Sequence, residues 1–161
     1  MKYILLFFSH GAFLAIGFAL GIYLLPILTA PKSADIEQIE KLSSNVIYQT
    51  EFKKGQRGND FLHWGEGKVM ITNTEIIFKG KIAPGPDYKI YLTKKYVEHE
   101  DEFLPIKSEA LFVSDLKNFE NFIIPINSNV NFNNYNTILI GVKHLKNLLL
   151  LQNINSYKKI S

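Results

Sequence analysis

Residues 83–92 read APGPDYKIYL, and this stretch decides the fold class. Proline fixes its own φ and glycine tolerates positive φ, so the Pro-Gly-Pro segment predicts a tight turn. The residues after the turn alternate, which places Tyr88, Ile90 and Leu92 on one face of a strand. A rigid turn that leads into an alternating strand indicates a β-sheet protein.

Short β-rich runs extend in both directions from this strand, separated by Gly, Pro, Asn and Asp. No helical periodicity alternates with them, so a parallel sheet is not expected. Runs of this length and spacing predict an antiparallel sandwich or barrel, mainly β in class, over residues 46–140. The runs are residues 46–52, 68–72, 75–82, 88–92, 110–113, 122–126 and 137–140.

The N-terminal segment has a different composition, because 22 of its first 30 residues are apolar. Tyr3 to Leu28 is 26 residues without a formal charge, and about 20 apolar residues cross a hydrocarbon core. A cleaved signal peptide is the alternative, but its apolar region is about 7–15 residues long and residues 28–30 before Pro31 are a poor cleavage site. Residues 1–30 therefore predict a transmembrane anchor, and we expect a single-pass cell-membrane protein with its soluble domain outside the cytoplasm.

Two glycines in this segment, Gly17 and Gly21, form a small-xxx-small pattern that lets two spanning helices approach closely. A homodimer through these residues is one interpretation. Glycine is common in spanning helices in general, and that explanation is favoured.

Residues 31–45 predict a juxtamembrane helix or linker, with Ile36, Ile39 and Leu42 at helical spacing. Asp35 and Gln38 resemble a capping box at its start. We interpret this helix as a spacer.

The charge balance argues against a nucleic-acid partner. Up to Ile140 the chain has 14 basic and 15 acidic residues, so the net charge of +3 comes wholly from four lysines after it. The body therefore lacks a basic patch for phosphate. The absence of cysteine excludes disulfides, thiolate catalysis and Cys-ligated metals in the chain as written.

The most distinctive polar stretch is residues 60–67, DFLHWGEG, which contains the only tryptophan. His63 and a carboxylate such as Glu66 could form an acid–base pair or ligate a metal. A second His at ligand spacing is lacking, so no metal site is predicted. Packing of Trp64 beside glycine turns explains most of the pattern. The acidic residues 98–102 are interpreted as a solvated loop.

Several of these motifs together resemble the bacterial membrane-anchored form of the electron-transfer DM13 (DM-thirteen) domain family. They are the span ending in GIYLLP (21–26), LHWGEG (62–67), the turn and strand APGPDY…YL (83–92), the strand around 119–125 and NYNT (134–137). The resemblance implies a β-sandwich outside the cytoplasm that passes electrons to a redox partner protein. It adds Asp87 of the turn to His63, Trp64 and Glu66 as binding candidates.

In the family this transfer is proposed to use a single cysteine, either as a free thiol or within a prosthetic-group site such as haem. The cysteine belongs to a Trp-Cys-Glu tripeptide that ends the last strand and precedes Phe-rich helical sequence. Here Ile140 is followed by Gly141, and Val142 stands at the cysteine position. The resemblance thus implies no catalytic residue in this copy and leaves its cofactor unknown.

A shifted reading frame accounts for residues 141–161. With suitable codons and one T restored before the Gly141 codon, residues 141–154 become Trp-Cys-Glu-Ala-Phe-Lys-Glu-Phe-Ile-Thr-Ala-Ala-Lys-Tyr, and a stop codon appears across Tyr157 and Lys158. Apart from Leu, the first two bases of each codon are set by the amino acid, so few alternatives exist at each position. A diverged strand with an unrelated tail is the alternative.

The sequence therefore predicts a membrane-anchored electron-transfer sandwich that lacks its redox residue. The competing interpretation is a non-catalytic anchored binding or scaffold module that uses residues 60–67 as its contact surface. An enzyme that acts through His63 and a carboxylate is a third, weaker interpretation.

Overall fold

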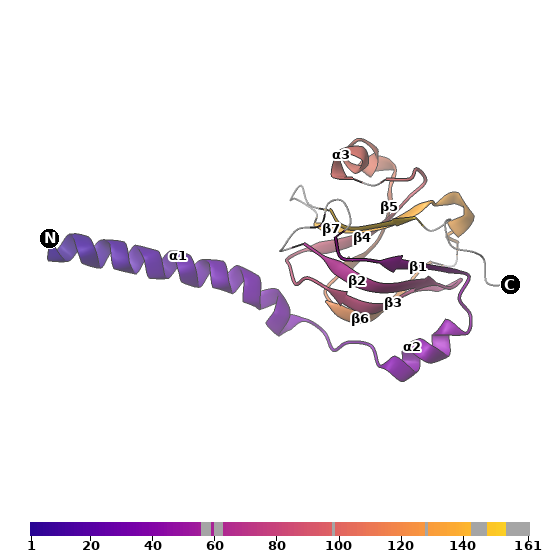
Figure 1. Cartoon of the computed structure of the whole chain (residues 1–161), viewed down its shortest axis with the longest axis horizontal. Helices are drawn as coiled ribbons and strands as arrows, with labels where there is room; N and C mark the ends of the chain where they lie inside the picture. Colours follow the sequence, from indigo (N-terminus) through magenta and orange to yellow (C-terminus); the bar gives the residue numbers. More distant parts are fainter. Residues whose placement is uncertain (56–58, 60–62, 98, 128, 143–147, 154–161) are drawn as a thin grey trace.

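The computed structural model describes residues 1–55, 59, 63–97, 99–127, 129–142 and 148–153. Helix α1 (Lys2–Thr29) contains the whole apolar segment, and none of its residues is buried. It projects away from the β-rich body (Figure 1). By length and composition α1 is able to cross a membrane, and a signal sequence near an N-terminus meets the same criterion. The helix ends at Thr29, two residues before Pro31.

Two four-stranded antiparallel sheets pack face to face and confirm the mainly-β sandwich. The first sheet has the order β1 (Tyr48–Phe52), β2 (Gly65–Ile71), β3 (Glu75–Ile82), β6 (Glu120–Pro125). The second has the order β5 (Leu111–Leu116), β4 (Tyr88–Thr93), β7 (Thr137–Val142), β8 (Leu148–Asn153).

The core between the sheets comes from the period-two pattern of the strands. Tyr88, Ile90 and Leu92 all point inward and are at most 1% exposed, as the alternation predicted. From the opposite sheet, the ring of Phe78 stacks on that of Phe122 with centroids 4.8 Å apart. Burial of side chains of this size contributes roughly 1.5–3 kcal/mol each.

Helix α2 (Ile36–Ser43) covers the outer face of the first sheet rather than acting only as a spacer. Ile39 is fully buried there against Met70 and Ile77. The predicted capping box is wrong: Asp35 is the N-cap residue, but its side chain makes no capping hydrogen bond. Its carboxylate instead lies 3.7 Å from the ammonium of Lys32.

Helix α3 (Glu100–Phe103) overlaps residues 98–102, which the sequence predicted as a solvated loop, and the 3₁₀ helix η1 (Leu104–Glu109) follows it. Phe103 is buried against Tyr91 and Leu139 on the outer face of the second sheet, while Asp101 and Glu102 stay exposed. One apolar residue after the acidic run therefore anchors the segment. The short 3₁₀ helix η2 (Phe132–Asn134) precedes β7.

The strands differ most from the predicted runs at β2, at β5, which continues to Leu116, and at β8. β2 begins at Gly65 because Gly65 and Glu66 already pair with Ile82 and Lys81. β8 was not predicted, because residues 141–161 are interpreted from the sequence as the product of a shifted reading frame. It forms because β7 offers an unpaired edge, and it also lies beside β1.

Candidate functional site

The two motifs that are most distinctive in the sequence meet at one end of the sandwich. The backbone N–H of Ala83, at the start of the turn, donates to the carbonyl of Trp64 over 2.8 Å. This bond joins the segment before β2 to the turn before β4. We call this the helix-proximal end, because the last turn of α1 borders it.

Trp64 and Glu66 both contact the ammonium of Lys54 at this end. The ammonium of Lys54 lies 3.8 Å from the centroid of the Trp64 ring and 3.2 Å from a Glu66 carboxylate oxygen. Trp64 is half-buried and packs against the core, as the packing interpretation expected. His63 is also half-buried. Asp60, the other carboxylate of this stretch, lies outside the described residues.

Asp87 belongs to a second charged cluster. Its φ of 55° is in the left-handed region, which Asp tolerates better than most residues. The Asp87 carboxylate accepts a 2.7 Å hydrogen bond from Lys89, whose ammonium also bonds Asp115 of β5. The hydrogen bond that Lys89 donates to Asp115, followed by the one that it donates to Asp87, raises the pKa of Lys89 above its ordinary value. Lys89 therefore stays charged between two carboxylates.

Tyr88 occupies the centre of the helix-proximal end. Its phenol packs so closely on Gly85 that a β-carbon there would come within 2.6 Å of the Tyr88 Cζ. Its ring meets Phe119 edge-on, with centroids 6.1 Å apart. In the ladders of β4, Tyr88 pairs with Leu116 on one side and with Val142 on the other. Position 142 thus lies at this end of the fold, on the strand beside Tyr88.

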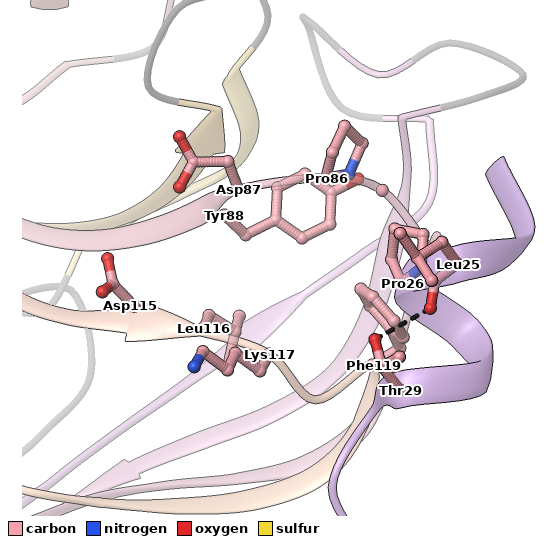
Figure 2. Close-up of a pocket in the computed structure, with 11 residues that line it drawn as sticks. Leu25, Pro26, Thr29, Pro86, Asp87, Tyr88, Asp115, Leu116, Lys117 and Phe119 are labelled. Atoms are coloured by element: carbon pink, nitrogen blue, oxygen red, sulfur yellow. Dashed lines mark hydrogen bonds between the residues drawn. The ribbon is translucent and has the colours of Figure 1, made fainter. Parts of the chain in front are cut away.

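A cavity of about 450 Å³ separates α1 from the helix-proximal end (Figure 2). Leu25, Pro26 and Thr29 of α1 form one wall, and the Thr29 hydroxyl donates to the Leu25 carbonyl over 2.8 Å. The opposite wall comes from the turn before β4 and from the end of β5. Its residues are Gly85, Pro86, Asp87, Tyr88, Asp115, Leu116, Lys117 and Phe119.

Comparison with models of known protein families shows which family the chain belongs to. The family model for the electron transfer DM13 domain matches residues 58–143. The chain belongs to the DM13 family. No curated protein and no solved structure matches it. The DM13 match spans β2 to β7 and includes Trp64, Asp87, Tyr88 and position 142, whereas α1, α2 and β8 lie outside it.

The cavity beside α1 does not suit a haem held by an axial His, Cys or Met. None of these residue types lines the cavity. Among the residues that the structure describes, no group of three or more His, Asp or Glu side chains gathers in a way that could hold a metal ion.

Sequence reasoning missed three residues of this DM13 site: Lys54, Lys89 and Asp115. Each contacts a charged or aromatic side chain in another strand or loop. Lys89 and Asp115, for example, are 26 positions apart in the sequence. Pattern analysis of a single strand has no signal for such pairs. The binding roles of His63, Trp64, Glu66 and Asp87 stay predictions.

Proposed function

We propose that the protein is a single-pass membrane-anchored electron-transfer protein whose DM13 domain lies outside the cytoplasm and whose redox residue belongs at position 142. The observation that carries this proposal is the family match, which runs through residue 143 and so includes that position. Val142 occupies it in this chain. Because valine carries no redox-active group, this copy is redox-impaired.

The proposed anchor is α1, which is long and apolar enough to span a bilayer. Alkaline carbonate washing of membranes should leave the full chain in the pellet. The cell membrane is kept sealed while the layers outside it are made permeable. Protease added from outside should then digest the sandwich and leave α1. Recovery of a shortened soluble chain, cleaved near Ala30, would identify α1 as a signal sequence instead.

The shifted reading frame is the proposed origin of the tail. It supports the proposal because one added nucleotide restores Trp-Cys-Glu in the strand that the structure pairs with Tyr88. Reading the gene across the Ile140 codon tests it directly. A run of T before GG is expected, and a sequence without that run would contradict the frame shift.

The redox proposal is tested by comparing three full-length chains in mild detergent. They are the chain as given, the variant Val142→Cys, and the chain with the restored Trp-Cys-Glu end. Ser108→Cys is the matched control, because it places a thiol on an exposed residue of η1 far from the site. Protein-film voltammetry before and after thiol alkylation measures the couple.

We expect an alkylation-sensitive wave from the restored chain and a weaker one from Val142→Cys. The wave should have a potential distinct from that of Ser108→Cys, because position 142 is next to Tyr88 whereas Ser108 is in water. The same potential in all thiol variants would show that the site does not tune the thiol. A wave from the chain as given would contradict redox impairment.

The proposed partners are the membrane and a redox protein, with a homodimer through Gly17 and Gly21 as a further proposal. Within the described structure nothing lies within 4 Å of where a β-carbon at either glycine would be, so this helix face has room for a second helix. Gly17→Leu with Gly21→Leu should abolish crosslinked dimers in membranes, and Ala12→Leu should not. Unchanged crosslinking would remove the dimer proposal.

A further inference from the structure

The cavity between α1 and the sandwich combines walls of two kinds. Leu25 and Pro26 make the α1 side apolar, and Pro86 and Phe119 continue this character on the sandwich side. Asp115 and Lys117 stand at the side away from α1 (Figure 2). A volume of about 450 Å³ is within the usual range of roughly 300–1,000 Å³ for small-molecule sites.

The cavity lies at the end of α1, and this position determines which ligands can reach it. Thr29 is the last residue of α1, so with α1 in a bilayer the cavity lies where hydrocarbon gives way to headgroups. A ligand that enters along Leu25 and Pro26 comes from the membrane. One that is also held near Lys117 needs a polar group that accepts hydrogen bonds. The expected ligand is therefore amphipathic and dissolved in the lipid.

Tyr88 connects this cavity to the proposed redox position. It lines the cavity and is the direct β4 partner of Val142 in β7. Directly opposite residues of an antiparallel pair have Cα atoms about 4.5–5.5 Å apart. A ligand in the cavity is thus separated from position 142 by one residue pair.

We propose that this cavity binds the ring of a lipid-soluble quinone, with its isoprenoid tail leaving along α1 toward the bilayer. The proposal rests on the proposed function, because the electron-transfer family and the membrane anchor select a lipid-soluble electron carrier over an ordinary lipid. Aromatic and proline rings pack on the quinone ring, and Lys117 offers a donor for one of its carbonyl oxygens. An acyl chain would pack on the apolar wall, but it has no group that could accept a hydrogen bond from Lys117.

Trp64 makes the binding measurable, since it is the only tryptophan and its carbonyl bonds the residue that begins the turn of the site. Decylubiquinone is titrated into the full chain in detergent micelles, and Trp64 emission is followed with excitation at 295 nm. n-Decanol, which has an alkyl tail of the same length without the ring, is the competitor. Saturable quenching that decanol does not reverse is expected.

Three variants locate the binding. Thr29→Phe adds a ring to the α1 wall of the cavity, and it should raise the decylubiquinone concentration at half-maximal quenching at least tenfold. Thr29→Val keeps the side-chain size and should leave it within twofold. Leu28→Phe adds the same ring to an exposed neighbour that does not line the cavity, and it should also have little effect.

Quenching that rises linearly in all chains, or a midpoint unchanged by Thr29→Phe, would overturn the proposal. Equal competition by decanol would assign the cavity to acyl chains and also overturn it. These outcomes are independent of the thiol couple of Val142→Cys, which is measured without quinone. Failure of the quinone site and failure of the proposed function therefore give different results.

Discussion

Tyr88 lies directly opposite Val142 in the antiparallel pair of β4 and β7. Tyr88 is also 1% exposed and packs on Gly85 and Phe119. The proposed redox position is therefore next to one of the most constrained side chains of the domain. A substitution at Tyr88 should therefore change the surroundings of position 142, because the two residues are paired in neighbouring strands.

Tyr88→Ala should destabilise the fold strongly. The change leaves a cavity of aromatic size in the core, and such truncations cost about 3–5 kcal/mol. Tyr88→Phe keeps the ring against Phe119 and should cost much less. Chemical denaturation of the full chain in mild detergent, followed by Trp64 emission, measures both. Similar losses for the two variants would mean that the phenol oxygen, and not the ring, is the main contributor.

Gly80→Ala should destabilise β3 by about 2–3 kcal/mol, through overpacking. A β-carbon at Gly80 would come within 2.6 Å of the Gly67 Cα, which lies directly opposite in β2. Gly55→Ala is the control. Its φ of 81° is unfavourable for alanine, but among the described residues nothing lies within 4 Å of where its β-carbon would be. The change should therefore cost only about 1–2 kcal/mol, from backbone strain and not from overpacking. Equal losses in the two variants would argue against the close approach of β2 and β3.

Lys89→Met should lower the free energy of unfolding by about 1–2 kcal/mol at neutral pH, because two carboxylates lose the cation that they share. The folded-state pKa of Lys89 is raised, first by Asp115 and then by Asp87. Its stabilisation is therefore fully present below the unfolded-state pKa of about 10.4 and is lost as the pH rises through the folded-state value.

The difference between the original chain and Lys89→Met should thus be constant from pH 6 to 9 and shrink above about pH 10.4. Denaturation curves at stepped pH check this. Lys81→Met is the control, since Lys81 pairs with Glu120 over 2.8 Å but its side chain is 63% exposed. Its removal should have a smaller effect at neutral pH. A difference for Lys89→Met that grows with pH would contradict the assigned sign.

Lys54→Met should cost about 0.5–1 kcal/mol through the lost contact of its ammonium with the Trp64 ring. The emission of Trp64 should change as well, because the cation lies 3.8 Å from the ring centroid. Lys53→Met is the matched control, as Lys53 pairs with Glu51 instead. The same emission change in both variants would show that Lys54 does not cover the ring in solution.

Local sequence pattern was a good guide wherever one element determines its own environment. The alternation of Tyr88, Ile90 and Leu92 predicted which side chains are buried. The uncharged run from Tyr3 to Leu28 predicted a helix long enough to span a bilayer. Pattern predicted the helix α2 but not its packing on the first sheet, and it did not predict β8. Packing on a sheet face and pairing with a sheet edge are tertiary events.

The sequence by itself determined the class of fold, the apolar helix, the family, and the absence of any thiol at position 142. The tertiary structure alone decided that Trp64, Asp87, Tyr88 and position 142 share one end of the sandwich, beside the last turn of α1. The physical reason is that strand pairing joins residues tens of positions apart through backbone hydrogen bonds. The sequence around each of these residues contains no pattern that identifies its partner in the neighbouring strand.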